Sequence, residues 1–219
     1  MKFNIIDKSK WERIEYYEHF TKNIPCTFSI TNNIDITNIL PVLKNKNIKF
    51  YPFMIYSITK IVNSYENFRI SIEDNNLGFF DYLNPSYTIL NNNNKLFSTI
   101  WTKYNNDFKI FYNNYLKDLN NFSNTNKLII KKPINNTFNI SCIPWVSFTS
   151  FNLNLQNNYN YFLPIFTIGK YFNDREKILL PLNAQVHHAV CDGYHISLFF
   201  NDLQQFIYNF NNSKFKAVD

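Results

Sequence analysis

The stretch QVHHAVCDGYHIS, residues 185–197, holds three of the four histidines in this chain of 219 residues, together with an aspartate, a glycine and a cysteine. Residues 177–190 are rich in apolar side chains, which alternate with polar ones from Leu182 to His187, a pattern typical of a strand. From Ile196 to Phe210, apolar residues recur at helical spacing instead. We therefore expect the stretch to join a strand over 177–190 to a final helix over 193–210.

A metal site is the first interpretation of the histidine cluster. In a strand, His187 and His188 point to opposite faces of the sheet, which disfavours both imidazoles binding one metal ion. A zinc site also needs a third and a fourth ligand at close spacing, and only Cys191 and His195 are near. We expect no metal here.

A helix start and a cysteine nucleophile are the other two interpretations. Asp192 is suited to cap the final helix and Gly193 to make the turn before it, but that leaves the paired histidines unexplained. Cys191 as a nucleophile would need a base and a group to orient that base. A small, buried, apolar role fits this cysteine better.

Composition and charge limit the function classes. The chain is 45% hydrophobic and 19% aromatic, which is enough for one large core. Its net charge is +6 and its pI about 9.0. The lysines are scattered, so this charge suits a phosphorylated cofactor as well as a nucleic acid. We expect no nucleic-acid partner.

The cysteines and the N-terminal residues indicate the compartment. Cys26, Cys142 and Cys191 are odd in number and widely spaced, which argues against a disulfide framework. The N-terminal residues show no apolar stretch suited to a signal peptide, and no run of 18 apolar residues occurs. We expect a cytoplasmic protein without a membrane-bound part.

The remaining patterns predict one mixed α/β domain over residues 1–219. Ser9 and Glu12 form a capping-box pattern before a helix over 10–22. Further helices are expected over 51–65 and 106–122, and a short helix capped by Asp35 or Thr37 is expected to end at Leu43. A hairpin turn is expected at 74–76. Strands are expected over 26–36, 68–73, 77–82, 87–90 and 96–101, and within 138–155 and 161–172.

HHAVCDG, residues 187–193, fits the H-H-x-x-x-D-G motif of coenzyme A-dependent acyltransferases. Chloramphenicol acetyltransferases, dihydrolipoyl acyltransferase cores and condensation domains share that motif. The surrounding segments IPCTFSIT (24–31), KFYPFMIY (49–56), PWVSFTSFNLN (144–154) and FTIGKYF (166–172) resemble the chloramphenicol acetyltransferase family, in order and spacing. The resemblance runs from about Trp11 to about Phe206. A dihydrolipoyl core would normally bring lipoyl domains, and a condensation domain would be about twice as long.

The resemblance implies a two-layer sandwich of a mixed β-sheet and helices, assembled as a homotrimer with active sites at the subunit interfaces. It implies direct transfer of an acetyl group from acetyl-CoA to the primary (C3) hydroxyl of chloramphenicol in a ternary complex. Acetyl-CoA would be a co-substrate, with no permanently bound cofactor.

The family's catalytic residues match five positions. His188 matches the general base, whose ring in this family bonds to its own main-chain carbonyl, and Ser141 matches the oxyanion donor. Thr167 matches a position that binds an ordered water. Asp192 and Arg13 match a structural ion pair.

The family's binding residues match a set of mostly apolar positions. For the acceptor pocket these are Phe20, Cys26, Phe28, Phe97, Phe151, Leu153, Leu155 and Ile165. For coenzyme A they are Lys49 and Tyr171. Two positions depart from the family: Phe20 stands where some members have Tyr, and Asn139 where an aromatic residue is common.

Two alternatives remain open from the sequence. One is an enzyme of the same fold that acetylates another small alcohol or an amine. The other is a protein that binds the drug without turnover, which would need none of His188, Ser141, Asp192 and Arg13.

Overall fold

A mixed β-sheet forms the centre of the computed structural model, which describes residues 2–91, 93–122, 127–154 and 160–210. Its strand order is β2-β10-β8-β7-β5-β6, with β9 paired to β10. The pairs β5–β7 and β7–β8 are parallel and the others antiparallel. The strands are β2 Thr27–Asp35, β5 Asn84–Leu90, β6 Phe97–Trp101, β7 Thr137–Cys142, β8 Ile165–Ile168, β9 Phe172–Asp174 and β10 Lys177–His187.

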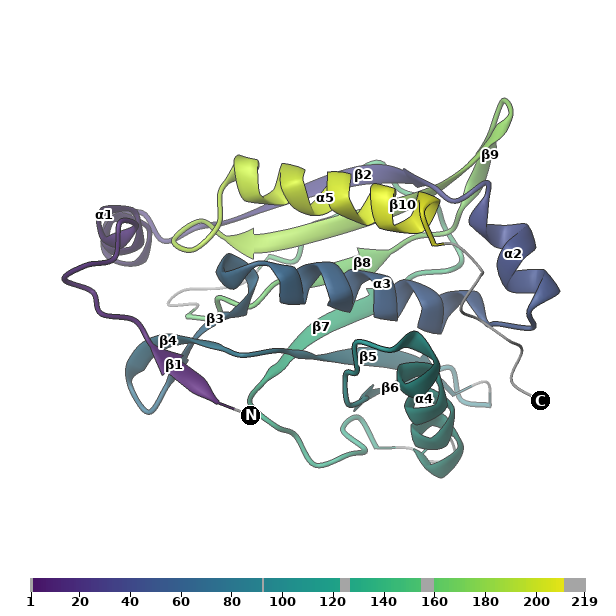
Figure 1. The fold of residues 1–219 in the computed structure, drawn as a ribbon, viewed down its shortest axis with the longest axis horizontal. Coiled ribbons are helices and arrows are strands. Elements are labelled where there is room, and N and C mark those ends of the chain that lie inside the picture. Colours follow the sequence, from purple (N-terminus) through teal and green to yellow (C-terminus); the bar gives the residue numbers. More distant parts are fainter. Residues whose placement is uncertain (1, 92, 123–126, 155–159, 211–219) are drawn as a thin grey trace.

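Helices form the second layer (Figure 1). Helix α3 packs against α5 and α4, and α5 also packs on β2. A separate small sheet has the order β1-β4-β3. These elements are β1 Phe3–Ile5, α1 Ile14–Glu18, α2 Ile39–Asn45, α3 Phe50–Ser64, β3 Ile70–Glu73, β4 Asn76–Phe80, α4 Phe108–Phe122 and α5 Gly193–Tyr208. The predicted mixed α/β fold with two layers is confirmed.

Side-chain alternation on β10 separates a core face from a polar face. Ala184 pairs with Phe166 of β8, and the Phe166 ring lies 4.8 Å from that of Phe199 in α5. The other face of β10 carries polar side chains. Asn183 pairs with Thr167, and Thr167 pairs with Ser141. A row of polar side chains thus crosses three strands on the face turned away from α5.

Several predicted elements are confirmed. The hairpin of β3 and β4 turns at Asp74 and Asn75, both with positive φ (48° and 64°), a conformation that Asp and Asn tolerate better than most residues. Helix α3 has the predicted Pro52 in its first turn, where a missing N–H costs nothing. Helix α5 begins at Gly193, as predicted.

One prediction near the chain's polar turns is wrong. Ser9 does not cap a helix, because its N–H and hydroxyl both donate to the Asp7 side chain; a helix first forms at Ile14 and continues as a π-helical segment, His19–Asn23. The strand expected within 138–155 is β7, which ends at Cys142. Pro144, which has no N–H for a ladder, follows two residues later.

Two further observations concern the cysteines and the helices. Each of the three cysteines is a free thiol. In the ranges that the structure describes, no helix is both long and apolar enough to cross a membrane.

Candidate active site

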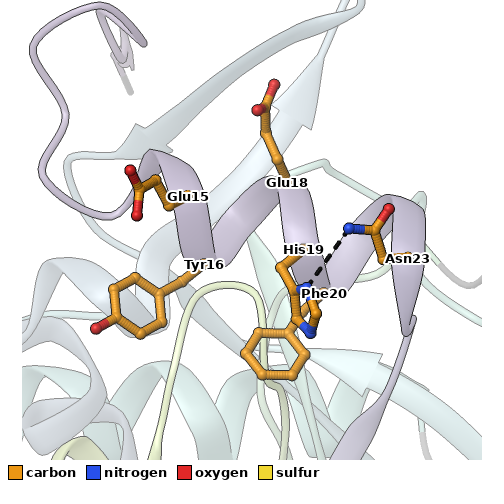
Figure 2. Close-up of a pocket in the computed structure, with 6 residues that line it drawn as sticks. All are labelled: Glu15, Tyr16, Glu18, His19, Phe20 and Asn23. Atoms are coloured by element: carbon orange, nitrogen blue, oxygen red, sulfur yellow. Dashed lines mark hydrogen bonds between the residues drawn. The ribbon is translucent and has the colours of Figure 1, made fainter.

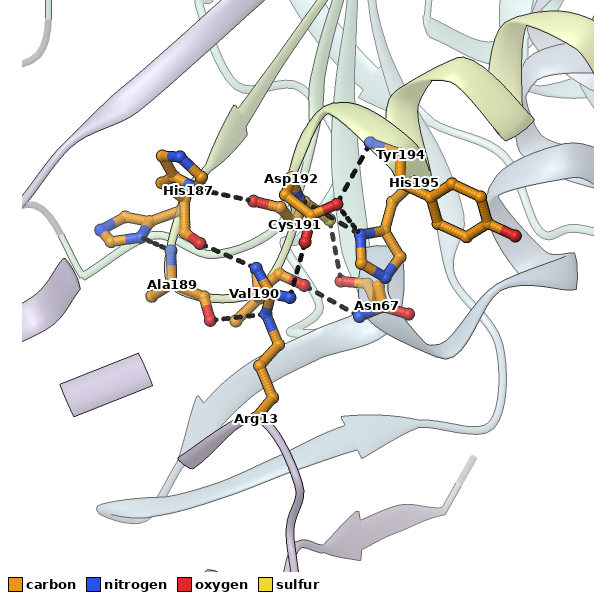
Figure 3. Close-up of polar contacts among 10 residues, drawn as sticks. Arg13, Asn67, His187, Ala189, Val190, Cys191, Asp192, Tyr194 and His195 are labelled. Carbon is orange, nitrogen blue, oxygen red and sulfur yellow. Dashed lines mark hydrogen bonds and ion pairs between the residues drawn. The ribbon is translucent and has the colours of Figure 1, made fainter. Parts of the chain in front are cut away.

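Arg13 holds the loop between β10 and α5 from one side (Figure 3). Its Nε donates to the Ala189 carbonyl at 3.1 Å and its Nη2 to the His188 carbonyl at 3.1 Å. Its Nη1 donates to Asp192 Oδ2 at 2.9 Å. The planar fork of the guanidinium suits such a set of fixed acceptors. One side chain from the N-terminal region therefore fixes the main chain at the position of the predicted base.

Asp192 performs two structural roles at once. It is the N-cap of α5, and its Oδ1 accepts the Tyr194 N–H at 3.2 Å. Partial burial acts to raise the pKa of this carboxyl, but hydrogen bonds and charge from Arg13 and His195 outweigh it, so the pKa is lowered. The sequence indicated a helix cap and an ion pair as separate roles for Asp192. In the structure, its one carboxylate has both roles.

The His188 ring is oriented by the turn that follows it. Its Nδ1 lies 3.2 Å from the Cys191 carbonyl oxygen, whereas the resemblance implied a bond to its own carbonyl. That expectation is wrong: the ring meets the Cys191 carbonyl, and the His188 carbonyl accepts from Arg13 Nη2. A carbonyl oxygen only accepts, so Nδ1 carries the hydrogen in the neutral ring. Nε2 is then the basic nitrogen.

Two aromatic rings enclose the His188 imidazole. The Phe20 ring stacks on it with centroids 4.0 Å apart and an interplanar angle of 7°. The Phe28 ring meets it at 5.1 Å and 60°. The Cys26 carbonyl accepts the His188 N–H at 3.0 Å. The structure thus brings three predicted pocket residues to His188.

His187 lies apart from this group. Its side chain is buried, its Nδ1 accepts the Ala189 N–H at 3.1 Å, and its ring packs on Phe162 at 4.8 Å. Within the described ranges, no group of three His, Cys, Asp or Glu side chains could hold a metal ion.

A surface hollow of about 540 Å³ lies on the outer side of Phe20 (Figure 2). Its lining residues are Glu15, Tyr16, Glu18, His19, Phe20 and Asn23. Both glutamates are exposed, and Glu18 pairs with Lys22 at 2.9 Å. Phe20 therefore both lines this hollow and stacks on the imidazole of His188.

Ser141 and Thr167 meet on the polar face of the sheet. Their residues pair across the parallel strands β7 and β8, and their hydroxyl oxygens lie 3.1 Å apart. Thr167 is buried and Ser141 half-buried. A buried hydroxyl partner fixes the Ser141 rotamer, so its Oγ has a defined direction.

An apolar cavity of about 680 Å³ opens beside Ser141. Phe97, a predicted pocket residue, lines it, and so does Trp145, which is 65% exposed. Burial raises the pKa of the Cys142 thiol, which also lines the cavity, to about 11. The other lining residues are Tyr51, Thr88, Ile89, Leu90, Lys95, Leu119, Ile143 and Pro144.

Within one chain, Ser141 and His188 are far apart. Ser141 lies two strands from Asn183, and His188 lies five residues further along the chain. Strand spacing and rise place the two Cα atoms roughly 15–20 Å apart. For both side chains to hydrogen-bond one tetrahedral centre, His188 Nε2 and Ser141 Oγ must lie only about 6–7 Å apart. The structure therefore divides the predicted catalytic residues into a His188 group and a Ser141 group.

The remaining predicted pocket residues follow β7 or lie in β8. Ile165 pairs with Gln185 of β10 and with Asn139 of β7, and Asn139 donates to the Tyr161 hydroxyl at 3.0 Å. Phe151 and Leu153 belong to a segment held on the polar face by two buried amides. Asn183 donates to the Phe151 carbonyl (2.9 Å), and Gln185 bonds both the N–H and the carbonyl of Leu153. Leu155 lies outside the described residues.

The two predicted coenzyme A residues are exposed. Tyr171 packs edge-on against Phe50, with ring centroids 6.1 Å apart. Lys49 precedes that phenylalanine, and its main-chain N–H donates to the Tyr112 hydroxyl at 3.1 Å. Lys49 and Tyr171 thus both lie next to Phe50, with exposed side chains.

The sequence analysis missed two residues that hold the His188 loop. Asn67 Nδ2 donates to the Val190 carbonyl at 2.9 Å, and the Asn67 carbonyl faces the buried Cys191 thiol. His195 Nδ1 lies 2.8 Å from Asp192 Oδ1. The i, i+3 spacing of Asp192 and His195 at a helix start was the signal available for the second contact.

Comparisons with known proteins show which family the chain is similar to. The family model described as chloramphenicol acetyltransferase matches residues 1–204. The chain is 50% identical over 212 residues to the chloramphenicol acetyltransferase of Clostridium butyricum, covering 96% of this chain and 97% of that protein. The corresponding protein of Staphylococcus aureus is 48% identical over 210 residues, with 95% and 97% covered.

A solved structure named chloramphenicol acetyltransferase shares the fold, with a TM-score of 0.83 and 22% identity over 94% of this chain and 100% of that one. A dihydrolipoamide acetyltransferase of Azotobacter vinelandii matches at a TM-score of 0.65 and 13% identity, covering 84% and 82%. With the matched family model and the curated relatives, these findings show that the chain belongs to the chloramphenicol acetyltransferase family.

Proposed function

We propose that this protein transfers the acetyl group of acetyl-CoA to the primary (C3) hydroxyl of chloramphenicol, with His188 as general base in a ternary complex. The observation that carries the proposal is the His188 tautomer. Nδ1 is committed to the Cys191 carbonyl, which leaves Nε2 to accept a proton. The family membership of the chain supports the choice of acetyl donor and acceptor.

The chemical step requires a base and an oxyanion donor. A neutral alcohol is a poor nucleophile, so His188 Nε2 takes the hydroxyl proton as the oxygen attacks the thioester carbonyl. The C–O bond forms, and the carbonyl electrons move to oxygen. Ser141 donates a hydrogen bond to that oxyanion, which collapses and expels the coenzyme A thiolate. His188 returns the proton to the thiolate, so the base is regenerated.

Thr167 assists in the same step through Ser141. Its hydroxyl contacts the Ser141 hydroxyl, and in this proposal it also binds an ordered water near the tetrahedral centre. Arg13 and Asp192 take no proton; they hold the main chain on either side of His188.

The proposed enzyme is a homotrimer whose active sites lie between subunits. The support is the separation of His188 from Ser141 in one chain, which no side-chain rotation closes. In a ring of identical subunits, His188 of one chain meets Ser141 and the apolar cavity of the next. Phe97 and Trp145, exposed apolar side chains that line the cavity with Ser141, provide surface for such a contact.

The proposed ligands fit the two kinds of surface. Chloramphenicol occupies apolar surface formed by the cavity beside Ser141, with Phe97, Phe151, Leu153 and Ile165, and by Phe20, Cys26 and Phe28 of the facing chain. Acetyl-CoA approaches past Lys49 and Tyr171, where the lysine charge attracts a phosphate. We infer a cytoplasmic location, where acetyl-CoA is present.

One assay tests the activity. Thiol release from acetyl-CoA is followed with and without chloramphenicol, and the product is identified by mass spectrometry. We expect release that depends on chloramphenicol and yields the mono-acetylated drug. Release with other alcohols alone would replace the proposed acceptor, and drug binding without any release would overturn the proposal.

A further inference from the structure

The Asp192 carboxylate is held at both of its oxygen atoms (Figure 3). Arg13 Nη1 binds Oδ2 at 2.9 Å, and Oδ1 lies 2.8 Å from His195 Nδ1 and also accepts the Tyr194 N–H at 3.2 Å. The Asp192 side chain is 34% exposed, so water competes for any oxygen that lacks a protein donor. The His195 side chain is 19% exposed and covers one of these oxygens.

The Nδ1 atom of His195 faces a donor as well as an acceptor. The main-chain N–H of Asp192 points at it from 3.2 Å, while Oδ1 lies at 2.8 Å. One ring nitrogen either carries a hydrogen or accepts one. The shorter contact is to a carboxylate, which only accepts, and hydrogen bonds to charged acceptors are the stronger ones. Nδ1 therefore carries the hydrogen and donates it to Asp192.

The carboxylate in turn controls Arg13. The guanidinium contacts the His188 and Ala189 carbonyls and the Asp192 carboxylate together, so Asp192 is one of the three groups that set its plane. A rotation of the carboxylate would tilt the fork and release the main chain at His188. His195 thus acts on the predicted base through Asp192 and Arg13, without contact with a substrate.

We propose that His195 is a positioning residue for acetyl transfer: its Nδ1–H fixes the Asp192 carboxylate, which holds Arg13 on the main chain of His188. This inference rests on the proposed function, because it assumes that His188 is the base.

Three substitutions separate this role from simple helix capping. Glutamine keeps a donor for Asp192, so His195→Gln should retain kcat within about twofold. Leucine has no donor, so His195→Leu should lower kcat about tenfold while both KM values change less than about twofold. His195→Glu should lower kcat further, because it places a second negative charge beside Asp192. A capping role alone predicts equal activity for Glu and Gln, since either residue closes a capping box.

A double-mutant cycle locates the effect at Asp192. When His195→Leu is added to Asp192→Asn, kcat should differ from that of Asp192→Asn alone by less than about twofold. Ser197→Ala is the matched control, because it alters a hydrogen bond in the same first turn of α5 without a contact to Asp192. It should leave kcat unchanged. If His195→Leu does not fold, the Gln and Glu variants decide.

Equal kcat values for the Gln and Glu variants, or a tenfold loss from His195→Leu in the Asp192→Asn background as well, would overturn the proposal. Failure of the proposed function is distinguishable, because the wild type would then show no chloramphenicol-dependent thiol release, or His188→Ala would retain activity. If all three His195 variants keep the wild-type kcat while His188→Ala is inactive, only the proposed role of His195 is contradicted.

Discussion

The His188 loop and the Ser141 strand pair are built in opposite ways. Polar contacts from Arg13 and Asn67 fix the loop, and aromatic rings enclose its imidazole. Ser141 contacts the Thr167 hydroxyl and lies beside an open apolar cavity. A general base needs a fixed orientation, and these contacts from within one chain fix the orientation of His188. An acceptor pocket needs enclosing surface, which in our proposal the next subunit supplies.

The largest expected effect is on His188. His188→Ala should lower kcat by about 10²–10⁴, the usual contribution of a general base. The midpoint of thermal unfolding should change little, because Arg13 binds main-chain carbonyls in this loop. Thiol release and a thermal melt measure the two quantities. Equal losses of activity and stability would contradict the division between chemistry and scaffold.

Ser141→Ala should rank next. Loss of one oxyanion donor lowers kcat by about 10²–10³, with little change in either KM. Thr167→Val keeps the shape and removes the hydroxyl that contacts Ser141. It should lower kcat less than Ser141→Ala does. Steady-state kinetics checks this order, and a larger loss from Thr167→Val would assign the oxyanion contact to Thr167 instead.

Asp192→Asn tests the scaffold. The ion pair is only partly buried, so the free energy of unfolding at neutral pH should fall by about 2 kcal/mol. The folded-state pKa of Asp192 lies below its ordinary value of 3.8, so the pair stabilises the protein above that pH. This stabilisation is lost as pH falls through the folded-state pKa.

Thermal melts of the wild type and Asp192→Asn between pH 7 and pH 3 measure this dependence. The difference in melting temperature should be constant near neutral pH and shrink below about pH 4. A constant difference down to pH 3 would show that the carboxylate charge is not what stabilises the loop.

Phe97→Ala should have the smallest effect. Phe97 lines the cavity beside Ser141 yet is 55% exposed in one chain, so we expect the KM for chloramphenicol to rise about fivefold. The KM for acetyl-CoA should stay constant. Leu96→Ala, at an exposed neighbour, is the matched control. An equal effect of both substitutions would remove Phe97 from the acceptor pocket.

The sequence predicted much of the fold because local patterns agreed with it. Alternation within residues 177–190 predicted β10, Pro52 indicated the first turn of α3, and Asp74-Asn75 indicated the hairpin turn. It failed where a nearby side chain competed for a polar group. The Ser9 hydroxyl donates to the Asp7 side chain, so Ser9 does not cap a helix and the first helix begins later than the capping pattern indicated.

The candidate site was predictable only in part. The HHAVCDG motif and its surrounding segments indicated His188, Ser141 and Asp192. No pattern could show that Asn67 would reach Val190, because that contact joins residues 123 positions apart. The tautomer of His188 also needed coordinates, since it depends on which carbonyl oxygen Nδ1 meets.

The most direct test of the central claim is a mixture of two inactive chains, His188→Ala and Ser141→Ala, unfolded and refolded together at equal concentration. If each site takes His188 from one subunit and Ser141 from the next, random trimers restore about a quarter of wild-type activity. Native mass spectrometry verifies that mixed trimers form. Mixed trimers with no more activity than the two variants alone would contradict the account, because both groups would then belong to one chain.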